Sequence, residues 1–197
     1  MKPDAERMSS AGPSDDALIA SAQAGDAKAF GEIVRRYQRA VYRVAWALTR
    51  NATDADDLAQ ETFVRAWGAI GTFERGLPLY PWLARICTNL AFSLFRSRRR
   101  KPETPLEPLL EAGKQWGVED DPAAHAERSE HDEKLRACFA ELAPEHQAVL
   151  ALRVLQDLSY DEIARALNVP AGTVMSRLSR ARAELKRRMS EERGGAP

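Results

Sequence analysis

Residues 158–189 read LSYDEIARALNVPAGTVMSRLSRARAELKRRM and predict two helices joined by a tight turn. Ser159 and Glu162 have the spacing of a capping box, so a short helix is expected directly after Ser159. Residues 168–172 contain the proline and glycine that favour a turn, and the last helix is expected over residues 173–189. Two helices joined by a turn of this length are typical of a helix-turn-helix.

The predicted last helix has an apolar and a polar face. Val174, Leu178 and Ala181 recur at helical spacing, so this face is expected to pack on the preceding helix. The opposite arc carries hydroxyl and guanidinium groups, and its members are Thr173, Ser176, Ser179, Arg180 and Arg187, with Arg177 and Arg182 at its flanks. Such groups are suited to base edges and phosphates in the major groove of DNA. The alternative is an ordinary amphipathic helix with a cationic surface.

Helical periodicity also dominates the N-terminal half, and strand signals are nearly absent. Four helices are expected before residue 101. The first is expected to be capped by Asp15 or Asp16, the second by Asp26, the third by Thr53 or Asp54, and the fourth to begin at Pro81 or Trp82. Aromatic side chains at helical spacing are expected in the core, namely Trp46, Phe63, Trp67 and Phe92.

Charge divides the 197 residues into blocks, although basic and acidic side chains balance at 29 each. Residues 35–101 carry 13 basic and 5 acidic side chains and residues 150–197 carry 9 and 6, whereas residues 102–149 carry 4 and 12. Prolines in the acidic block indicate a linker. We therefore expect an all-α protein with two helical domains joined by a flexible acidic linker. The predicted divisions are a tail (1–14), a first domain (15–101), the linker (102–127), a second domain (128–190) and a tail (191–197).

Several classes of protein are disfavoured. No apolar run approaches the roughly 18 residues of a membrane helix, and no secretory signal is visible near the N-terminus. Cys87 and Cys138 suggest no disulfide framework, so a cytoplasmic protein is expected. Phosphate-binding and dinucleotide-binding motifs are absent, so neither a cofactor nor a small-molecule substrate is expected.

Two clusters of possible metal ligands have simpler explanations. They are Asp54, Asp56 and Asp57, which a metal-dependent nuclease could use, and His125, His131 and Cys138, which could be zinc ligands. The aspartates stand at a predicted helix start, where capping and the helix dipole favour acidic groups. The second cluster lacks the spacing of a tight ligand pair. We therefore expect neither a metal site nor an enzyme.

Aromatic, amide and basic residues gather near the end of the first domain. Tyr80, Trp82 and Asn89 precede the basic run of residues 96–101. Flat rings stack on unpaired bases, amides read base edges and arginines bind the backbone. Trp82 alone could be a core residue and the arginines could merely suit a helix C-terminus, but together they favour a nucleic-acid surface.

The third predicted helix has an acidic side. Asp57, Gln60 and Glu61 lie on it and disfavour DNA, so this side either docks a protein or is simply solvated.

Four segments resemble those of bacterial RNA polymerase sigma factors of the extracytoplasmic-function (ECF) group in the sigma-70 family. They are residues 54–67 (DADDLAQETFVRAW), 81–91 (PWLARICTNLA), 158–164 (LSYDEIA) and 172–182 (GTVMSRLSRAR). The segments occur in the order of that family, and the resemblance extends over residues 15–189.

The resemblance implies a non-catalytic subunit that binds core RNA polymerase, directs it to promoters and opens the minus-ten element. Core polymerase would contact Asp57, Gln60 and Glu61. The minus-ten element, as a melted single strand, would contact Tyr80, Trp82, Arg85, Asn89, Arg96, Arg98, Arg99 and Arg100. The upstream minus-thirty-five duplex would contact Thr173, Ser176, Arg177, Ser179 and Arg180.

The resemblance further implies control by an anti-sigma factor, which could hold the protein at the inner membrane face. Two departures from the family pattern bear on promoter choice: Met175 replaces a usual Lys or Arg, and the loop Glu74–Tyr80 is unusually apolar. A free-standing helix-turn-helix regulator is the alternative, and it would bind a palindromic duplex without polymerase.

Overall fold

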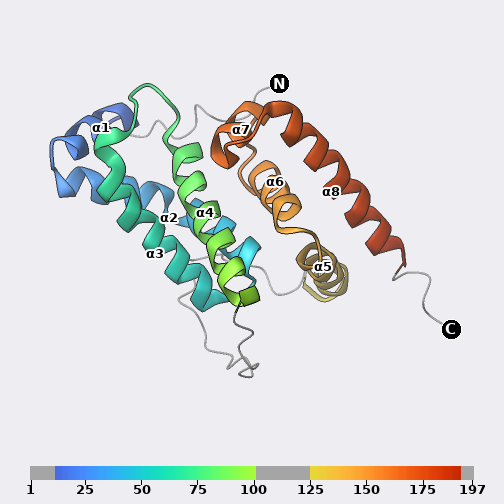
Figure 1. Cartoon of the computed structure of the whole chain (residues 1–197). Coiled ribbons are helices and arrows are strands. Elements are labelled where there is room, and N and C mark those ends of the chain that lie inside the picture. Colours follow the sequence, from blue (N-terminus) through green and yellow to red (C-terminus); the bar gives the residue numbers. More distant parts are fainter. Residues whose placement is uncertain (1–11, 101–124, 192–197) are drawn as a thin grey trace.

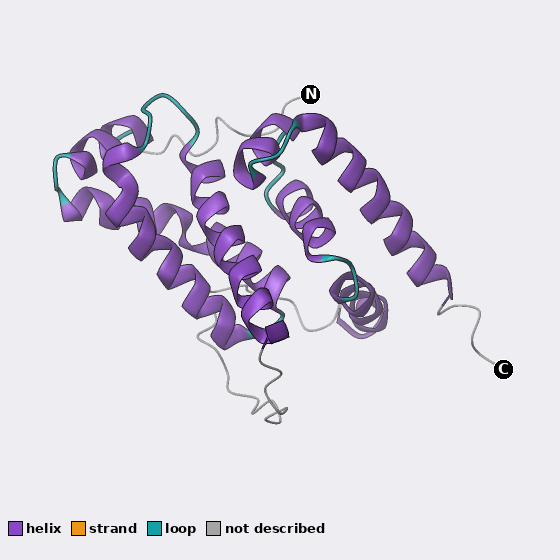
Figure 2. Cartoon of the chain, viewed as in Figure 1, coloured by secondary structure: helices purple, strands orange, loops and turns teal. Residues whose placement is uncertain are grey.

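The computed structural model describes residues 12–100 and 125–191, with the side chains of residues 12–98 and 133–191 (Figure 1). All regular secondary structure in these ranges is helical, which confirms the all-α prediction (Figure 2). The predicted linker and both predicted tails lie mostly outside the described residues.

Four α-helices and a short 3-10 turn form the first domain. They are α1 (Asp15–Gln23), α2 (Ala27–Thr49), α3 (Ala52–Ala69), η1 (Ile70–Thr72) and α4 (Leu79–Arg100). Helices α2, α3 and α4 pack on one another, and α1 packs on α2. Their shared core contains fully buried Ile19, Ile33, Val44 and Leu83, so helix faces of apolar spacing point inward as expected.

Two helix caps differ from the prediction. The Ser14 hydroxyl caps α1 by accepting from the backbone N–H of Ala17, and Asn51 caps α3 by accepting from the N–H of Asp54. Asp15 instead accepts a hydrogen bond from Arg36 of α2 at 2.9 Å. A tertiary partner has therefore drawn this carboxylate away from the cap, which local spacing could not reveal.

The first residue of α4 and the burial of Trp67 also differ from the prediction. Helix α4 begins at Leu79, so Pro81 lies in the first turn. Its lack of a backbone N–H costs no helical hydrogen bond there, because N–H groups of the first turn have no acceptor within the helix. Trp67 lies near the end of α3 with 39% of its surface exposed, whereas Phe63 is buried. The Trp67 ring packs on Phe30 with 5.0 Å between ring centroids, and only part of the indole is covered.

The second domain contains the helix-turn-helix. Its helices are α5 (His125–Ala140), α6 (Pro144–Leu155), α7 (Tyr160–Leu167) and α8 (Ala171–Glu191). The capping box of Ser159 and Glu162 is present, and Asn168 ends α7 in the left-handed conformation, with φ of 53°. Helix α8 begins two residues earlier than predicted because the Pro170 carbonyl accepts from the N–H groups of Thr173 and Val174.

The two domains lie in direct contact. Helix α7 packs along α4, as the adjacent green and orange helices of Figure 1 show, and α6 packs on α2. The Gln156 amide, at the end of α6, donates to the carbonyl of Ala40 in α2 at 3.4 Å. Buried apolar side chains of both domains join in a single cluster. The described chain is therefore one packed unit built from two helical domains.

Candidate nucleic-acid and protein interfaces

Helix α8 carries the polar face that the sequence predicts. Val174, Leu178 and Ala181 are buried, which turns the opposite arc outward. On this arc Ser176, Ser179 and Arg180 are exposed, while Thr173 and Arg177 are half-buried. The described residues provide no carboxylate within ion-pair distance of either arginine. Two uncompensated cations beside small hydroxyl groups leave this face able to bind a polyanion.

Met175 lies beside that face with 51% of its surface exposed. An apolar side chain therefore stands in solvent at the position where the family pattern has Lys or Arg.

Helix α4 brings part of the predicted single-strand surface together. Arg85, Asn89 and Arg96 are exposed, and Trp82 is half-buried. The indole of Trp82 packs on Phe73 of the preceding loop, with 5.1 Å between ring centroids and 58° between ring planes. The Phe73 ring thus fixes the Trp82 indole beside exposed arginine and asparagine side chains.

Arg98 is engaged within the domain. It donates to Asp54 of α3 at 2.8 Å, and the other carboxylate oxygen of Asp54 is buried without a partner among the described residues. The ion pair ties the end of α4 to the start of α3. The side chains of Arg99 and Arg100 lie outside the described residues.

Tyr80 points into the domain rather than toward the α4 surface. Its hydroxyl donates to the carbonyl of Ala40 at 3.3 Å, and its ring stacks on Tyr37 at 6.0 Å between centroids. Burial raises the pKa of the Tyr80 phenol well above its ordinary value. In this arrangement Tyr80 anchors the first turn of α4 to α2.

A cavity of about 360 Å³ lies between the loop before α4 and α4 itself. Phe73, Trp82 and Arg85 line it from the first domain. Arg165 and Asn168 line it from the end of α7, in the second domain. The loop adds Leu77 and Pro78 and also the carboxylate of Glu74. Flat rings and cations around such a space suit a single nucleotide base.

Gln23 holds this loop in place, a role that sequence patterns did not indicate. Its amide nitrogen donates to the carbonyls of Ile70 and Phe73 at 3.0 and 2.8 Å, and its amide oxygen accepts from Arg75 at 2.6 Å. The loop residue Gly76 has φ of 83°, which favours glycine there. The contacts join residues about 50 positions apart, so no local signal could have found them.

The acidic face of α3 borders a second cavity. Asp57 and Gln60 are exposed, and Glu61 is half-buried and pairs with Arg65 at 2.7 Å. A cavity of about 540 Å³ lies beside them between α2 and α3, and Gln60 lines it. Val64 also lines it, with 66% of its surface exposed. Val64 lies one turn after Gln60, and this spacing is the sequence signal that places both residues beside the cavity.

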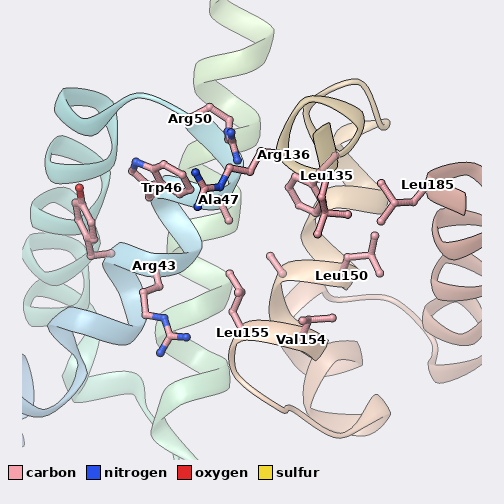
Figure 3. Close-up of a pocket in the computed structure, with 13 residues that line it drawn as sticks. Arg43, Trp46, Ala47, Arg50, Leu135, Arg136, Leu150, Val154, Leu155 and Leu185 are labelled. Carbon is pink, nitrogen blue, oxygen red and sulfur yellow. The ribbon is translucent and has the colours of Figure 1, made fainter. Parts of the chain in front are cut away.

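An apolar groove of about 580 Å³ lies where the two domains meet (Figure 3). Helices α2, α5, α6 and α8 contribute to it, and its apolar lining includes Trp46, Leu135, Phe139, Leu150, Val154 and Leu185. Arg43, Arg50 and Arg136 also line it, and no described carboxylate pairs with them. Burial, and secondarily the charge of Arg136, lowers the pKa of Arg50. Such a groove suits apolar side chains flanked by carboxylates.

Asp54, Asp56 and Asp57 do not converge into a possible metal site. No group of three or more His, Cys, Asp or Glu side chains among the described residues is placed to hold a metal ion. The side chains of His125 and His131 lie outside the described set. Of the described helices, none has the length and apolar character needed to cross a bilayer.

Two parts of the chain match established family descriptions. Residues 33–101 match sigma-70 region 2, which spans most of the first domain, and residues 132–185 match sigma-70 region 4, which spans most of the second.

Curated relatives agree with this match. The chain is 34% identical over 177 residues to the ECF RNA polymerase sigma-E factor of Haemophilus influenzae, covering 85% of this chain and 91% of that protein. It is 37% identical over 159 residues to the ECF sigma factor SigE of Mycolicibacterium smegmatis, covering 79% of this chain and 59% of that longer protein.

Solved structures share the fold. CnrH, solved in complex with the cytosolic domain of CnrY, superposes with a TM-score of 0.67 at 28% identity, covering 90% of this chain and 97% of CnrH. The sigma factor RpoE of Bartonella quintana, solved with the anti-sigma factor NepR, has a TM-score of 0.64 at 24% identity over 83% of this chain and 98% of that one, and supports the fold alone.

Regions 2 and 4 thus occur in order, with an acidic face on one domain and a helix-turn-helix on the other. The chain belongs to the ECF RNA polymerase sigma factors of the sigma-70 family.

Proposed function

We propose that this chain directs core RNA polymerase to promoters and opens them, and that three separate surfaces divide the work. The observation that carries the proposal is the separation of an acidic face on α3 from polar and basic faces on α4 and α8. One protein partner and two forms of DNA can then be bound at different places. The chain acts by binding alone, without catalytic groups of its own.

The α3 face is the proposed docking surface for core polymerase. Asp57, Gln60 and Glu61 offer carboxylate and amide groups to a basic partner surface. Val64 adds an exposed apolar contact beside the α2–α3 cavity. A small apolar centre with a polar rim is how protein interfaces are commonly built.

The α4 surface is the proposed site of minus-ten binding and melting. Trp82, Arg85, Asn89 and Arg96 would contact the single strand, with an extruded base in the cavity beside Phe73. Arg99 and Arg100 remain proposed backbone contacts. Tyr80 and Arg98, which bond within the domain, would support α4 and contact DNA only after rearrangement. Unstacking a base costs a few kcal/mol, which capture by rings and cations offsets.

The outer face of α8 is the proposed reader of the minus-thirty-five duplex. Its residues are Thr173, Ser176, Arg177, Ser179 and Arg180. The exposed Met175 removes one cationic contact relative to the family pattern and favours a different or weaker upstream element.

An anti-sigma factor is the proposed regulator. The similar structure of CnrH was solved with the cytosolic domain of CnrY, and that of RpoE from Bartonella quintana was solved with the anti-sigma factor NepR. The groove of Figure 3 offers apolar side chains and three arginines, which suit an amphipathic acidic segment. We expect the protein to act in the cytoplasm, held at the inner membrane face when its partner is anchored there.

Co-migration with core RNA polymerase on size exclusion tests the proposal. The intact chain should form a stable complex, and Asp57→Arg/Glu61→Arg should lose it. Glu145→Arg/Asp161→Arg places the same charge change on exposed residues of the second domain and serves as the matched control. Absence of a complex, together with tight binding to a palindromic duplex, would instead support a free-standing regulator.

A further inference from the structure

We propose that two copies of this chain associate through a two-fold interface, in which the α3 face of each copy docks in the apolar groove of the other (Figure 3). The α3 face consists of Asp57, Gln60, Glu61 and Val64. The association itself does not depend on the proposed function. Its consequence, competition between a second copy and core polymerase for the α3 face, rests on that function.

The α3 face is an exposed stripe of mixed acidic and apolar character. Its members recur at three- and four-residue spacing, so their side chains lie along one side of the helix. Asp57 and Val64 are exposed, and the described residues place no cation within ion-pair distance of Asp57. Arg65 pairs with Glu61 from the edge of the stripe at 2.7 Å. An exposed valine between carboxylates is an apolar contact that a second surface can bury.

The groove carries the complementary groups. Its lining is mainly apolar, and Leu135 and Val154 within it have 38% and 70% of their surface exposed. The described lining contains no acidic side chain but includes Arg43, Arg50 and Arg136. The groove therefore offers three cations around apolar walls.

Two of these cations lie close enough to repel each other. Arg136 reaches from α5 toward Arg50 of α2, as Figure 3 shows. Burial, and then the charge of Arg136, lowers the pKa of the Arg50 guanidinium. A carboxylate that enters the groove at this point relieves the repulsion between the two arginines. The groove is thus suited to an acidic partner more than to a neutral one.

The two surfaces match in charge and in apolar character. Protein interfaces commonly join an apolar centre to complementary charges at the rim. Val64 supplies the apolar centre of the α3 face, and Asp57 and Glu61 supply the carboxylates that the arginines of the groove lack. Because every copy of the chain carries both surfaces, a second copy is an occupant that the protein itself provides.

The position of Tyr42 favours a closed pair over an open chain of copies. Tyr42 of α2 lines both the groove and the cavity beside the α3 face. The two surfaces are therefore neighbours on either side of this residue. A two-fold axis near Tyr42 places each α3 face against the groove of the other copy, so both contacts form within one interface. Such a pair leaves neither surface free for a third copy.

The pair hides the α3 face from core polymerase. One α3 face cannot contact a second copy and polymerase at the same time, so the two partners compete by mass action. Free core polymerase therefore draws the chain out of the pair, and the pair holds the excess when polymerase is scarce. The pair also fills the groove that we assign to an acidic segment of an anti-sigma factor.

Reversal of charge on each surface tests the inference in the full chain. Asp57→Arg/Glu61→Arg reverses the α3 face, and Arg43→Glu/Arg136→Glu reverses the groove. Asp57, Arg43 and Arg136 are exposed and Glu61 is half-buried, so these variants should fold, and circular dichroism checks that they do.

Matched controls carry the same changes in charge at exposed positions outside both surfaces. They are Glu145→Arg/Asp161→Arg for the α3 face and Lys28→Glu/Arg182→Glu for the groove.

Sedimentation equilibrium without polymerase, from nanomolar to submillimolar concentration, measures the dissociation constant of the pair. We expect the unaltered chain and both controls to form two-copy particles with similar affinity. Each reversed variant should lose roughly tenfold or more in affinity. An equimolar mixture of the two reversed variants should regain the pair, because each α3 face then meets a groove of opposite charge.

Three results would overturn the inference without touching the proposed function. They are an unaltered chain that stays monomeric over the whole range, a mixture of reversed variants that stays monomeric, and a series of masses that grows beyond two copies. Failure of core polymerase to bind the unaltered chain at concentrations where it is monomeric would instead refute the proposed function. That failure would leave the pair of copies standing.

Discussion

Gln23 of α1 donates a hydrogen bond to the backbone carbonyl of Phe73 at 2.8 Å, across 50 positions of sequence. Phe73 in turn packs on Trp82, so the amide on α1 sets the position of the ring at the proposed minus-ten site. A buried or half-buried amide that satisfies loop carbonyls orders the loop because leaving those carbonyls unpaired is unfavourable. Gln23 is therefore a positioning residue for the α4 cavity.

Replacing Gln23 should impair promoter opening more than polymerase binding. Gln23→Ala removes the donors to Ile70 and Phe73, so the loop loses its fixed position at a cost of about 1–2 kcal/mol. Gln23→Glu keeps the shape and the acceptor for Arg75 but aims a carboxylate at two carbonyls, and should be at least as harmful. Permanganate reactivity of the melted strand and co-migration with core polymerase would measure the two effects.

Impaired polymerase binding with normal promoter opening would contradict the positioning role of Gln23. If Gln23→Glu opened promoters as well as the unaltered chain, the loop would not depend on this amide. Ser21→Asp, on the exposed side of α1, is the matched control.

Gln147 should be the polar residue whose loss most destabilises the second domain. It is 6% exposed, and its amide nitrogen lies within 3.0 Å of the carbonyls of Phe139, Ala140 and Leu142. Gln147→Ala removes this donor from the Ala140 and Leu142 carbonyls, whereas the Phe139 carbonyl still accepts from the N–H of Leu142. The substitution should lower the free energy of unfolding by about 1–3 kcal/mol. Chemical denaturation followed by circular dichroism measures this change.

The exposed Gln60 provides the comparison for that experiment. Gln60→Ala should change stability by no more than about 0.5 kcal/mol, since surface substitutions rarely do more. Equal effects of the two substitutions would argue against the capping role of Gln147.

Val64→Asp should weaken binding to core polymerase without destabilising the chain. Val64 is 66% exposed, so the folded monomer gains nothing from its apolar side chain, whereas a docked partner would bury it. A loss of roughly tenfold in affinity, which is about 1.4 kcal/mol, is expected by titration with labelled core polymerase. Unchanged affinity would remove Val64 from the docking surface, and Val154→Asp, at 70% exposure on α6, controls for an added charge.

Cys87 should be unreactive in the folded protein. Complete burial raises the pKa of its thiol to about 12, and a hydrogen bond with Thr62 opposes this only in part. Because the thiolate is the reactive form, alkylation at pH 8 should be negligible until denaturant is added. Ser190→Cys, at an exposed position, should be labelled within minutes. Rapid labelling of Cys87 in the native chain, read by peptide mass, would leave open a role in redox sensing.

Acid should loosen the end of α8. The guanidinium of Arg188 donates a hydrogen bond to the Glu184 carboxylate and is the main cause of the lowered pKa of that carboxyl. A hydrogen bond with His146 lowers it further. A carboxyl with a lowered pKa stabilises the fold above its unfolded pKa and loses this contribution as pH falls through its folded value. The difference in stability between the unaltered chain and Glu184→Gln should therefore be largest near neutral pH and shrink in acid, as measured by denaturation at each pH. A difference independent of pH would contradict this reading.

The helix-turn-helix was predictable because its signals are local. The capping box of Ser159 and Glu162 and the apolar spacing of α8 act over one or two helical turns, and both were found as expected. The cap of α1 was predicted wrongly because Asp15 has a distant competitor in Arg36. Residues predicted on α4 were largely brought together, but the inward position of Tyr80 depends on α2, which is far away in sequence.

The sequence by itself determined the helices, the family and the outer face of α8. Helical periodicity, caps and motifs depend on residues within a few positions of one another, so they can be recognised without the fold. The tertiary structure alone decided which residues surround the cavity at Trp82 and which line the groove between the domains. It also decided which residues join the two domains. Those features combine groups from helices more than 40 positions apart, such as the Ala40 carbonyl with the Gln156 amide. Packing of whole helix faces, rather than any short pattern, settles such pairings.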